Sequence, residues 1–244
     1  MKETREWWEA TAEYFQAEAS VDVGIEWGPG SRGETVDILP DIGGRDVIEL
    51  GCGGGQLTVG LARRGPRRLV GVDFSRSQLA YAQDLAKREG VDYELIEGDV
   101  TALPLATGGA DVAVSAYVFQ WVPDMRPVFA ETARVLRPGG TIVCSMPHPF
   151  YGIFDPKSQE LTRSYHNPGP DRREEAGIEP EQIIHYRRMS DIHEALREAG
   201  FVLDRLVEPG TADPAAYEGQ WDSVPELMAM VPRTLIVRAT LSED

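Results

Sequence analysis

Apolar strand-like segments alternate with amphipathic helical segments between residues 46 and 146, and this alternation restricts the fold more than any other feature of the chain. A parallel sheet covered by helices on both faces is the fold that accommodates such an order. The predicted strands are 46–50, 68–72, 91–96, 110–116 and 141–146. We therefore expect an α/β fold with a doubly wound sheet.

Capping residues mark the expected helix boundaries. Ser75 and Gln78 fit a capping box, and Gly90 ends the helix that they begin. Asp124 is predicted to cap the next helix, and Ser190 to cap one close to the C-terminus. Two late strands are expected at 201–207 and 234–240.

Two segments lie outside the alternation. Residues 2–19 are predicted to form a helix with Trp8 and Phe15 on one stripe. Residues 147–189 contain six prolines and show no clear period. A long segment of this kind is typical of a lid or a binding insertion, although a plain surface excursion stays open as an alternative.

The charge balance restricts the class of partner. The chain has 24 Lys and Arg against 40 Asp and Glu, a net charge of −16, which repels nucleic acid and anionic membranes. Only three of the basic residues are lysines. An acidic chain with few lysines is typical of an organism with a salty cytoplasm, where salt screens the repulsion between like charges. Arginine-rich codon usage in an ordinary acidic enzyme is the alternative. No apolar run could span a bilayer, and the first 15 residues are too charged for a signal peptide, so we expect a cytoplasmic protein without a membrane span. The two cysteines fit no metal pattern, and no metal is expected.

The loops after the predicted strands carry the candidate ligand-binding residues, because ligands bind beyond the carboxyl ends of open parallel sheets. A glycine-rich loop, 49–55, follows the first strand and lets a ligand approach the backbone closely. Asp73 ends the second strand, where a carboxylate can accept both ribose hydroxyls. Asp99 follows the third strand. The glycine loop and the acidic residues Glu49, Asp73 and Asp99 describe a nucleoside-like ligand that carries an amine.

A nicotinamide cofactor is the competing ligand. Its fingerprint is G-x-G-x-x-G, whereas this loop has Gly51, Gly53 and Gly55, and Gln56 stands where the last glycine is expected. Glu49 and Asp99 would also repel a pyrophosphate. The acidic set therefore favours a ligand with a cationic portion.

Five motifs resemble the class I S-adenosylmethionine-dependent methyltransferases in order and spacing over about residues 45–146. They are 47–55 (VIELGCGGG), 71–75 (GVDFS), 98–104 (GDVTALP), 120–124 (QWVPD) and 134–140 (RVLRPGG). Residues 199–209 and the late strands are similar to the subgroup of quinone, trans-aconitate and biotin-pathway enzymes. The resemblance implies a Rossmann-like, seven-stranded, mostly parallel sheet whose last strand is antiparallel, with an N-terminal helix and an insertion after the fifth strand.

The resemblance also implies a cofactor, S-adenosyl-L-methionine, and roles for individual residues. Gly51 and Gly53 would pack on its methionine portion, Asp73 would bind the ribose, and Phe74 would cover the adenine. Asp99 and the Val100 amide would contact the adenine edge, and the Tyr117 backbone would face the methionine amine. The complete set of expected cofactor contacts is Glu49, Gly51, Cys52, Gly53, Gln56, Asp73, Phe74, Gln78, Asp99, Val100, Tyr117 and Gln120.

Residues on loops at the same edge are candidates for the acceptor site. His148, His185 and Tyr186 are candidate acid–base or orienting groups, although a sulfonium leaving group makes no general base obligatory. Trp8, Tyr14, Trp121 and Tyr151 are candidate substrate contacts. For Trp8 and Tyr14, packing of the N-terminal helix on the sheet is an equal alternative to a lid.

The expected protein is a methyltransferase acting on a small molecule, with a single domain over 1–244. Within it we expect a helical lid (1–30), a cofactor-binding core (45–146), a substrate-site insertion (147–189) and a C-terminal helix and strands (190–244). The sequence leaves open whether the methyl acceptor is a carbon, a hydroxyl or a carboxylate. It also leaves the oligomeric state open. A non-catalytic S-adenosylmethionine-binding protein and a nicotinamide-dependent oxidoreductase are the alternatives.

Overall fold

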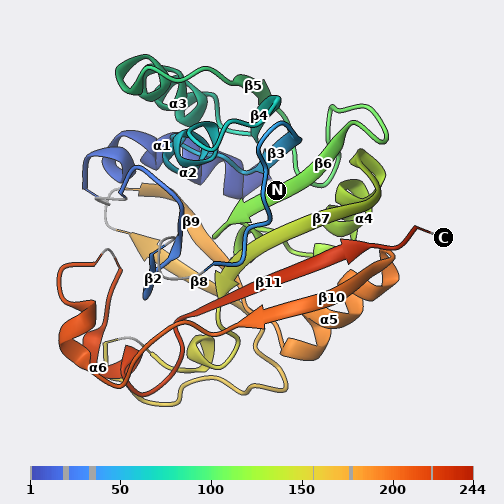
Figure 1. The fold of residues 1–244 in the computed structure, drawn as a ribbon. Coiled ribbons are helices and arrows are strands. Elements are labelled where there is room, and N and C mark those ends of the chain that lie inside the picture. Colours follow the sequence, from blue (N-terminus) through green and yellow to red (C-terminus); the bar gives the residue numbers. More distant parts are fainter. Residues whose placement is uncertain are drawn as a thin grey trace.

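Seven strands form one sheet in the computed structural model, which describes residues 2–18, 22–32, 37–155, 157–175, 178–220 and 222–243 (Figure 1). The strand order is β10-β11-β7-β6-β3-β4-β5. β3 to β7 run parallel, whereas β11 is antiparallel to both of its neighbours. The predicted doubly wound sheet with an antiparallel last strand is confirmed. The strand bounds are β3 (Asp46–Leu50), β4 (Arg68–Asp73), β5 (Glu94–Glu97), β6 (Ala110–Ala116), β7 (Leu136–Pro147), β10 (Phe201–Val207) and β11 (Thr234–Leu241).

Helices cover both faces of this sheet because successive strand residues alternate between two apolar clusters. Ile48 packs with helices α4 and α5 on one face, while Val47 packs with α2 and Trp27 on the other. The helix α1 lies against α3. The helix bounds are α1 (Lys2–Glu18), α2 (Gln56–Ala62), α3 (Arg76–Glu89), α4 (Met125–Val135), α5 (Met189–Glu198) and α6 (Pro225–Met228), with 3-10 turns η2 (Phe119–Trp121), η3 (Tyr151–Ile153) and η4 (Pro214–Tyr217).

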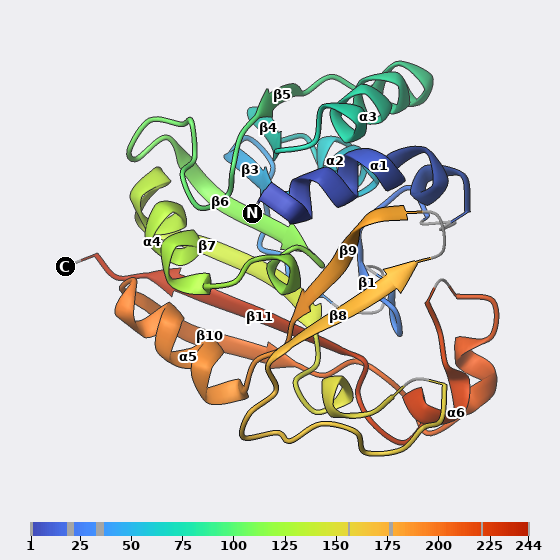
Figure 2. The same ribbon diagram turned by 180° about the vertical axis from the view of Figure 1, so that it is seen from behind.

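Two antiparallel hairpins lie outside the sheet. The short pair β1 (Glu26–Gly28) and β2 (Ser31–Arg32) follows the N-terminal helix. The longer pair β8 (Pro170–Glu175) and β9 (Ile178–His185) belongs to the segment 147–189, and β9 packs against α1 (Figure 2). In the parts of the chain that the structure describes, no helix is both long and apolar enough to cross a membrane.

Two sequence-based boundaries need correction. Ser190 does not cap α5, because the helix begins at Met189 and the side chain of Asp191 accepts a hydrogen bond from the backbone of Arg188. The third strand begins at Glu94 rather than at Val91. The predicted caps at Ser75 and Asp124 are confirmed, since their side chains accept hydrogen bonds from the backbone N–H groups of Gln78 and Arg126.

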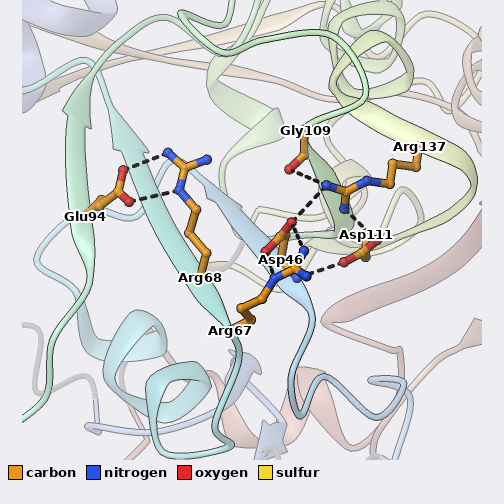
Figure 3. A network of polar contacts seen from close by, with 7 residues as sticks. All are labelled: Asp46, Arg67, Arg68, Glu94, Gly109, Asp111 and Arg137. Atoms are coloured by element: carbon orange, nitrogen blue, oxygen red, sulfur yellow. Dashed lines mark hydrogen bonds and ion pairs between the residues drawn. The ribbon is translucent and has the colours of Figure 1, made fainter.

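An ion-pair network centred on the buried Asp46 joins the amino-terminal ends of β3, β4, β6 and β7 (Figure 3). The Asp46 carboxylate accepts hydrogen bonds from the guanidinium of Arg67 and from Nη2 of Arg137 at 2.9 Å. Arg137 also donates to Asp111 Oδ1 at 2.6 Å, and Asp111 Oδ2 accepts from the Asp46 backbone N–H at 2.8 Å. The network therefore fixes the strand starts at the edge opposite to the loops that carry the ligand-binding candidates.

Replacing Asp46 by asparagine is expected to cost about 2 kcal/mol of folding free energy at pH 7, because hydrogen bonds to charged groups are lost. The Arg67 hydrogen bonds, opposed by burial and supported by Arg137, lower the pKa of Asp46 from its ordinary 3.8 to about 2. A lowered carboxyl pKa contributes stability that is complete above pH 4 and is lost as the pH falls towards 2. Urea unfolding from pH 7 to pH 2 measures the free energy of unfolding of the wild type and of Asp46→Asn. The difference between the two values should shrink below about pH 4.

Glu94→Gln is the matched control, since its pair with Arg68, also drawn in Figure 3, is about half exposed on both sides. Exposed pairs contribute less than about 1 kcal/mol. An equal loss of stability in the two variants, or a difference independent of pH, would contradict the role assigned to Asp46.

Candidate functional site

A cleft opens beyond the carboxyl ends of β3, β4, β5 and β6, where the sequence places its candidate residues. It encloses about 1070 Å³ of empty space, its mouth included. In open parallel sheets this crevice, beyond the carboxyl ends of the strands, is where ligands bind. The lining residues come from the strand ends, from α1 and from the segment after it: Trp8, Phe15, Gln16, Asp22, Gly24, Glu26, Gly28, Glu49, Gly51, Cys52, Gly53, Gly54, Gln56, Leu57, Asp73, Phe74, Gln78, Gly98, Val100, Ala116, Tyr117, Val118, Trp121 and Val122.

The glycine-rich loop forms the floor of the cleft. Its turn is fixed by Val72 at the end of β4, whose carbonyl oxygen accepts from the N–H groups of Gly51 at 2.7 Å and Cys52 at 3.0 Å. Gly51 has φ of 70°, and a Cβ there would lie 2.4 Å from Cγ2 of Val118. Only glycine therefore combines this backbone with this packing.

Asp73 links the end of β4 to the glycine loop. Its Oδ2 accepts from the Gly53 N–H and its Oδ1 from the Ser75 N–H, both at 2.9 Å. The side chain is buried, and burial raises its pKa although the backbone hydrogen bonds oppose the shift. Each carboxylate oxygen has a second lone pair, so the group can accept two further hydrogen bonds from a ligand.

Glu49 is the most deeply buried carboxyl of the cleft. Its Oε2 accepts from the Thr58 hydroxyl at 2.6 Å. Burial, reinforced by the charge of Asp73, raises its pKa to about 8 despite the Thr58 bond. The Glu49 carboxyl is therefore largely protonated at pH 7.

Three glutamines connect α1 to the floor of the cleft. Gln16 of α1 donates from Nε2 to Oε1 of Gln78 at 2.7 Å, and its Oε1 accepts from Nε2 of Gln56 at 2.6 Å. The Gln16 amide lies so close to Gly54 that a Cβ there would overlap it. Helix α1 thus closes one side of the cleft through polar contacts with the glycine loop.

A second contact anchors α1 at the start of α3. Glu9 accepts hydrogen bonds from the backbone N–H groups of Arg76 at 2.6 Å and Ser77 at 3.3 Å. A carboxylate at this end of a helix satisfies free N–H groups and complements the helix dipole. These hydrogen bonds outweigh burial and lower the pKa of Glu9.

Aromatic side chains roof the cleft. The ring of Trp121 stacks on Trp7 with centroids 5.6 Å apart and meets the edge of Trp8 at 5.4 Å, and Trp8 contacts Phe15 at 5.1 Å. Trp8, Phe15 and Trp121 line the cleft, whereas Trp7 is buried behind them. The N-terminal aromatic residues therefore both pack α1 and border the ligand space.

Most of the expected cofactor contacts lie in the cleft, and Asp99 and Gln120 do not. Asp99 Oδ1 accepts from the backbone and hydroxyl of Thr101, while its neighbour Val100 lines the cleft. Gln120 donates to the Tyr117 carbonyl at 2.7 Å. That carbonyl also accepts from Nε1 of Trp121 at 3.1 Å, so it holds the turn η2.

The candidate acid–base residues lie beside the cleft rather than in its wall. The backbone N–H of Phe150 donates to Nδ1 of His148, whose Nε2 is 2.7 Å from Oε1 of Glu208, so both ring nitrogens are occupied. His185 and Tyr186 border a smaller hollow, where burial, reinforced by Arg187, lowers the pKa of His185 to about 4. Burial also lowers the pKa of His148, so both histidines are largely neutral at pH 7.

Of the expected substrate contacts, Trp8 and Trp121 line the cleft and two others do not. Tyr14 is 61% exposed on the outer face of α1. Tyr151 is buried, with its ring 4.4 Å from Cζ of Arg233, a residue that no sequence pattern singled out.

Phe15, on the aromatic stripe of the predicted N-terminal helix, lines the cleft, whereas sequence reasoning missed the contributions of Gln16, Asp22 and Glu26. These three residues lie more than twenty positions before the glycine loop and follow no motif. The only sequence signal for these residues was the position of an acidic side chain, such as Asp22, next to the predicted lid helix. Among the described residues, no group of three or more His, Cys, Asp or Glu side chains is placed to hold a metal ion.

Comparisons with known proteins agree with this geometry. Residues 48–144 match the family described as the methyltransferase domain. The chain is 30% identical over 186 residues to a trans-aconitate 2-methyltransferase of Afipia carboxidovorans, covering 75% of this chain and 69% of that protein. It is 31% identical over 159 residues to a malonyl-acyl-carrier-protein O-methyltransferase of Hahella chejuensis, covering 65% of this chain and 54% of that one. It spans about half the length of several other curated relatives.

A solved structure extends the likeness beyond the matched domain. The crystal structure of an S-adenosylmethionine dependent methyltransferase from Mesorhizobium loti superimposes with a TM-score of 0.65 at 26% identity. The alignment covers 83% of this chain and 93% of that protein.

Proposed function

Since the chain belongs to the S-adenosylmethionine-dependent methyltransferases, we propose that it binds S-adenosyl-L-methionine in the cleft and transfers its methyl group to a small-molecule acceptor. The observation that carries this proposal is the buried Asp73 carboxylate, held by the Gly53 and Ser75 amides at the end of β4. It offers two free acceptor positions beside a loop that leaves the backbone uncovered.

The described residues fit this cofactor. Nε2 of Gln78 is buried, lines the cleft and has no hydrogen-bond partner among the residues that the structure describes. A buried donor of this kind is paired in nearly all proteins, so a ligand acceptor is expected there. Gly51 and Gly53, both with positive φ, leave room for an extended ligand over the loop.

The roles of the individual residues follow from their positions. Asp73 would bind the ribose hydroxyls, and Phe74 would cover the adenine beside the Val100 amide. Gly51 and Gly53 would contact the methionine portion, the end at which Asp73, and Glu49 once it has lost its proton, can balance the positive charge. Asp99 and Gln120 act through their neighbours, since neither lines the cleft.

Catalysis requires positioning more than proton transfer. When bound, S-adenosylmethionine supplies a methyl group on a good leaving group. The aromatic residues Trp8, Phe15 and Trp121 would exclude water and hold the acceptor in line, and fixed geometry of this kind contributes roughly 7 to 11 kcal/mol. An acid–base role for His148, His185 or Tyr186 stays a prediction.

Calorimetric titration with S-adenosylmethionine, S-adenosylhomocysteine and NADH tests the cofactor assignment, followed by a screen for transfer of a labelled methyl group. We expect the first two ligands to bind and NADH not to bind. Binding of NADH alone would contradict the proposal and favour an oxidoreductase. Binding without transfer to any acceptor in the screen would favour a non-catalytic binding protein.

The wider expectations stay proposals. We expect the protein to act in the cytoplasm, with its acidic surface suited to high salt, and without nucleic-acid partners. The division of 1–244 into lid, cofactor core, insertion and C-terminal part is likewise proposed. The relatives are named for acceptors as different as trans-aconitate and demethylmenaquinone, so the acceptor class must be argued from this chain's own residues.

A further inference from the structure

A cluster of arginine and tyrosine side chains lies next to the cleft at the carboxyl edge of the sheet. Arg233 immediately precedes β11, whose first residue pairs with the last residue of β7. The hairpin β8–β9 approaches the same edge (Figure 2). We refer to these residues as the arginine–tyrosine cluster: Arg163, Arg173, Arg233, Tyr117, Tyr151 and Tyr186.

Tyr117 is shared by the cleft and the cluster. It lines the cleft, and its ring is 5.8 Å from Cζ of Arg233. The Tyr117 hydroxyl is 2.7 Å from Oγ1 of Thr234. The Tyr117 ring therefore borders both the cleft and the guanidinium of Arg233.

Arg233 is a buried cation with an unused donor. Its side chain is 11% exposed, and its Cζ lies 4.4 Å from the centre of the Tyr151 ring. Nε of Arg233 is buried and has no hydrogen-bond partner within the described part of the chain. An unpaired N–H on a buried guanidinium is costly, which indicates a site for an acceptor oxygen.

The acidic partner of Arg233 is much more exposed than the arginine itself. Asp222 forms an ion pair with Nη2 of Arg233, yet its side chain is 58% exposed. Its φ of 49° lies in the left-handed region, which is uncommon for a residue other than glycine. A carboxylate held in this way, at the rim, can be exchanged for one that comes from solution.

The hairpin adds further positive charge. Arg163 and Arg173 both pair with Asp171, at 2.6 Å and 2.8 Å, and Nη2 of Arg173 donates to the Tyr186 hydroxyl at 3.2 Å. Asp155 also interacts electrostatically with Arg163, so the three arginines lie among three carboxylates. The cluster thus gathers three cationic side chains in a chain whose net charge is −16, and they can hold an anion that the rest of the surface repels.

We propose that the acceptor carries a carboxylate, which binds the guanidinium of Arg233 in the place that Asp222 occupies in this structure. This proposal rests on the proposed function and adds the chemical class of the substrate. A guanidinium offers two parallel N–H donors to a carboxylate, and Nε together with one terminal nitrogen gives that geometry. Tyr151 holds the plane of the guanidinium by stacking.

Binding of three simple acids, succinate, glutarate and tricarballylate, tests the proposal, with dimethyl succinate as the uncharged control. Each is titrated into the protein with and without saturating S-adenosylhomocysteine. We expect at least one acid to bind and the diester not to bind. Arg233→Gln should weaken binding by more than about tenfold, because hydrogen bonds to a charged group are lost.

Asp222→Asn gives the opposite expectation and distinguishes recognition from a structural ion pair. Removing the competing carboxylate should tighten binding of the acid by about threefold or more, with no change in S-adenosylhomocysteine affinity. Arg238→Gln is the matched control, because Arg238 lies on β11 away from the cleft and pairs with Asp204 of β10. Breaking this arginine–aspartate pair should change neither affinity. If Arg233→Gln does not fold, the affinity of Asp222→Asn for the acids still tests the proposal.

Two results would overturn the carboxylate site: no binding of any of the acids by the wild type and Asp222→Asn, or equal weakening by Arg233→Gln and Asp222→Asn. Failure of the proposed function has a different signature. In that case S-adenosylhomocysteine does not bind, while the acid titrations without it still report on Arg233.

Discussion

Asp73→Ala is expected to weaken S-adenosylmethionine binding by about 100-fold, equivalent to about 2.7 kcal/mol. The substitution removes the proposed acceptor of the ribose hydroxyls. It also removes the hydrogen bonds that Asp73 accepts from Gly53 and Ser75, so the glycine loop loses its connection to the end of β4. Hydrogen bonds to a charged group are each worth about 1.5 to 3 kcal/mol, which makes this one of the largest single effects in the cleft.

Calorimetric titration of the two proteins measures this loss. Asp84→Ala is the control for charge, since it removes one carboxylate from an exposed position of α3, where the side chain is 71% exposed. The control should bind the cofactor like the wild type. A loss smaller than about threefold in Asp73→Ala, or an equal loss in Asp84→Ala, would remove Asp73 from the cofactor site.

Gly51→Ala is expected to lower the free energy of unfolding by about 3 kcal/mol and to abolish most of the cofactor affinity. A residue with a Cβ pays roughly 1 to 2 kcal/mol for the left-handed conformation. Its methyl group would also meet Cγ2 of Val118 at 2.4 Å, so the loop or the end of β6 must shift. Both elements line the cleft, and a shift of either one misplaces the ligand contacts.

Gly44→Ala separates the two causes. Gly44 has φ of 69°, nearly the value of 70° at Gly51, but no atom lies within 4 Å of a Cβ placed there. The control should lose only the conformational part, about 1 to 2 kcal/mol, and keep its cofactor affinity. Urea unfolding and titration of both variants give the comparison; equal effects would show that packing against Val118 is unimportant.

Local patterns allowed most of the sheet and its caps to be predicted. The strands at 46–50 and 110–116 are short apolar runs between turn residues, and Ser75 and Asp124 cap their helices by contacts within three residues. The hairpin β8–β9 could not be predicted, because β8 is built from residues such as Arg172, Arg173 and Glu174 rather than from alternating apolar and polar residues. Its place is set by contacts with α1 and by ion pairs.

The residues of the candidate site also fall into a group that the sequence predicts and a group that it does not. Asp73 and the glycine loop were predictable because each directly follows a strand, and parallel strands bring their ends together. Gln16 and Arg233 were not, since the glutamines that Gln16 binds are 40 and 62 residues away and Tyr117, which contacts Arg233, is 116 residues away. A single arginine among 24 basic residues carries no sign of burial until the fold is known.

The protonated state of Glu49 connects the cleft to the acidity of the solution. A cation that arrives beside a carboxyl with a pKa of about 8 favours its ionised form. On the proposed function, capture of the sulfonium at pH 7 therefore expels a proton, and departure of the uncharged thioether product takes one back. Affinity for the methyl donor should therefore rise with pH up to the pKa of Glu49, because less work is then needed to ionise the carboxyl.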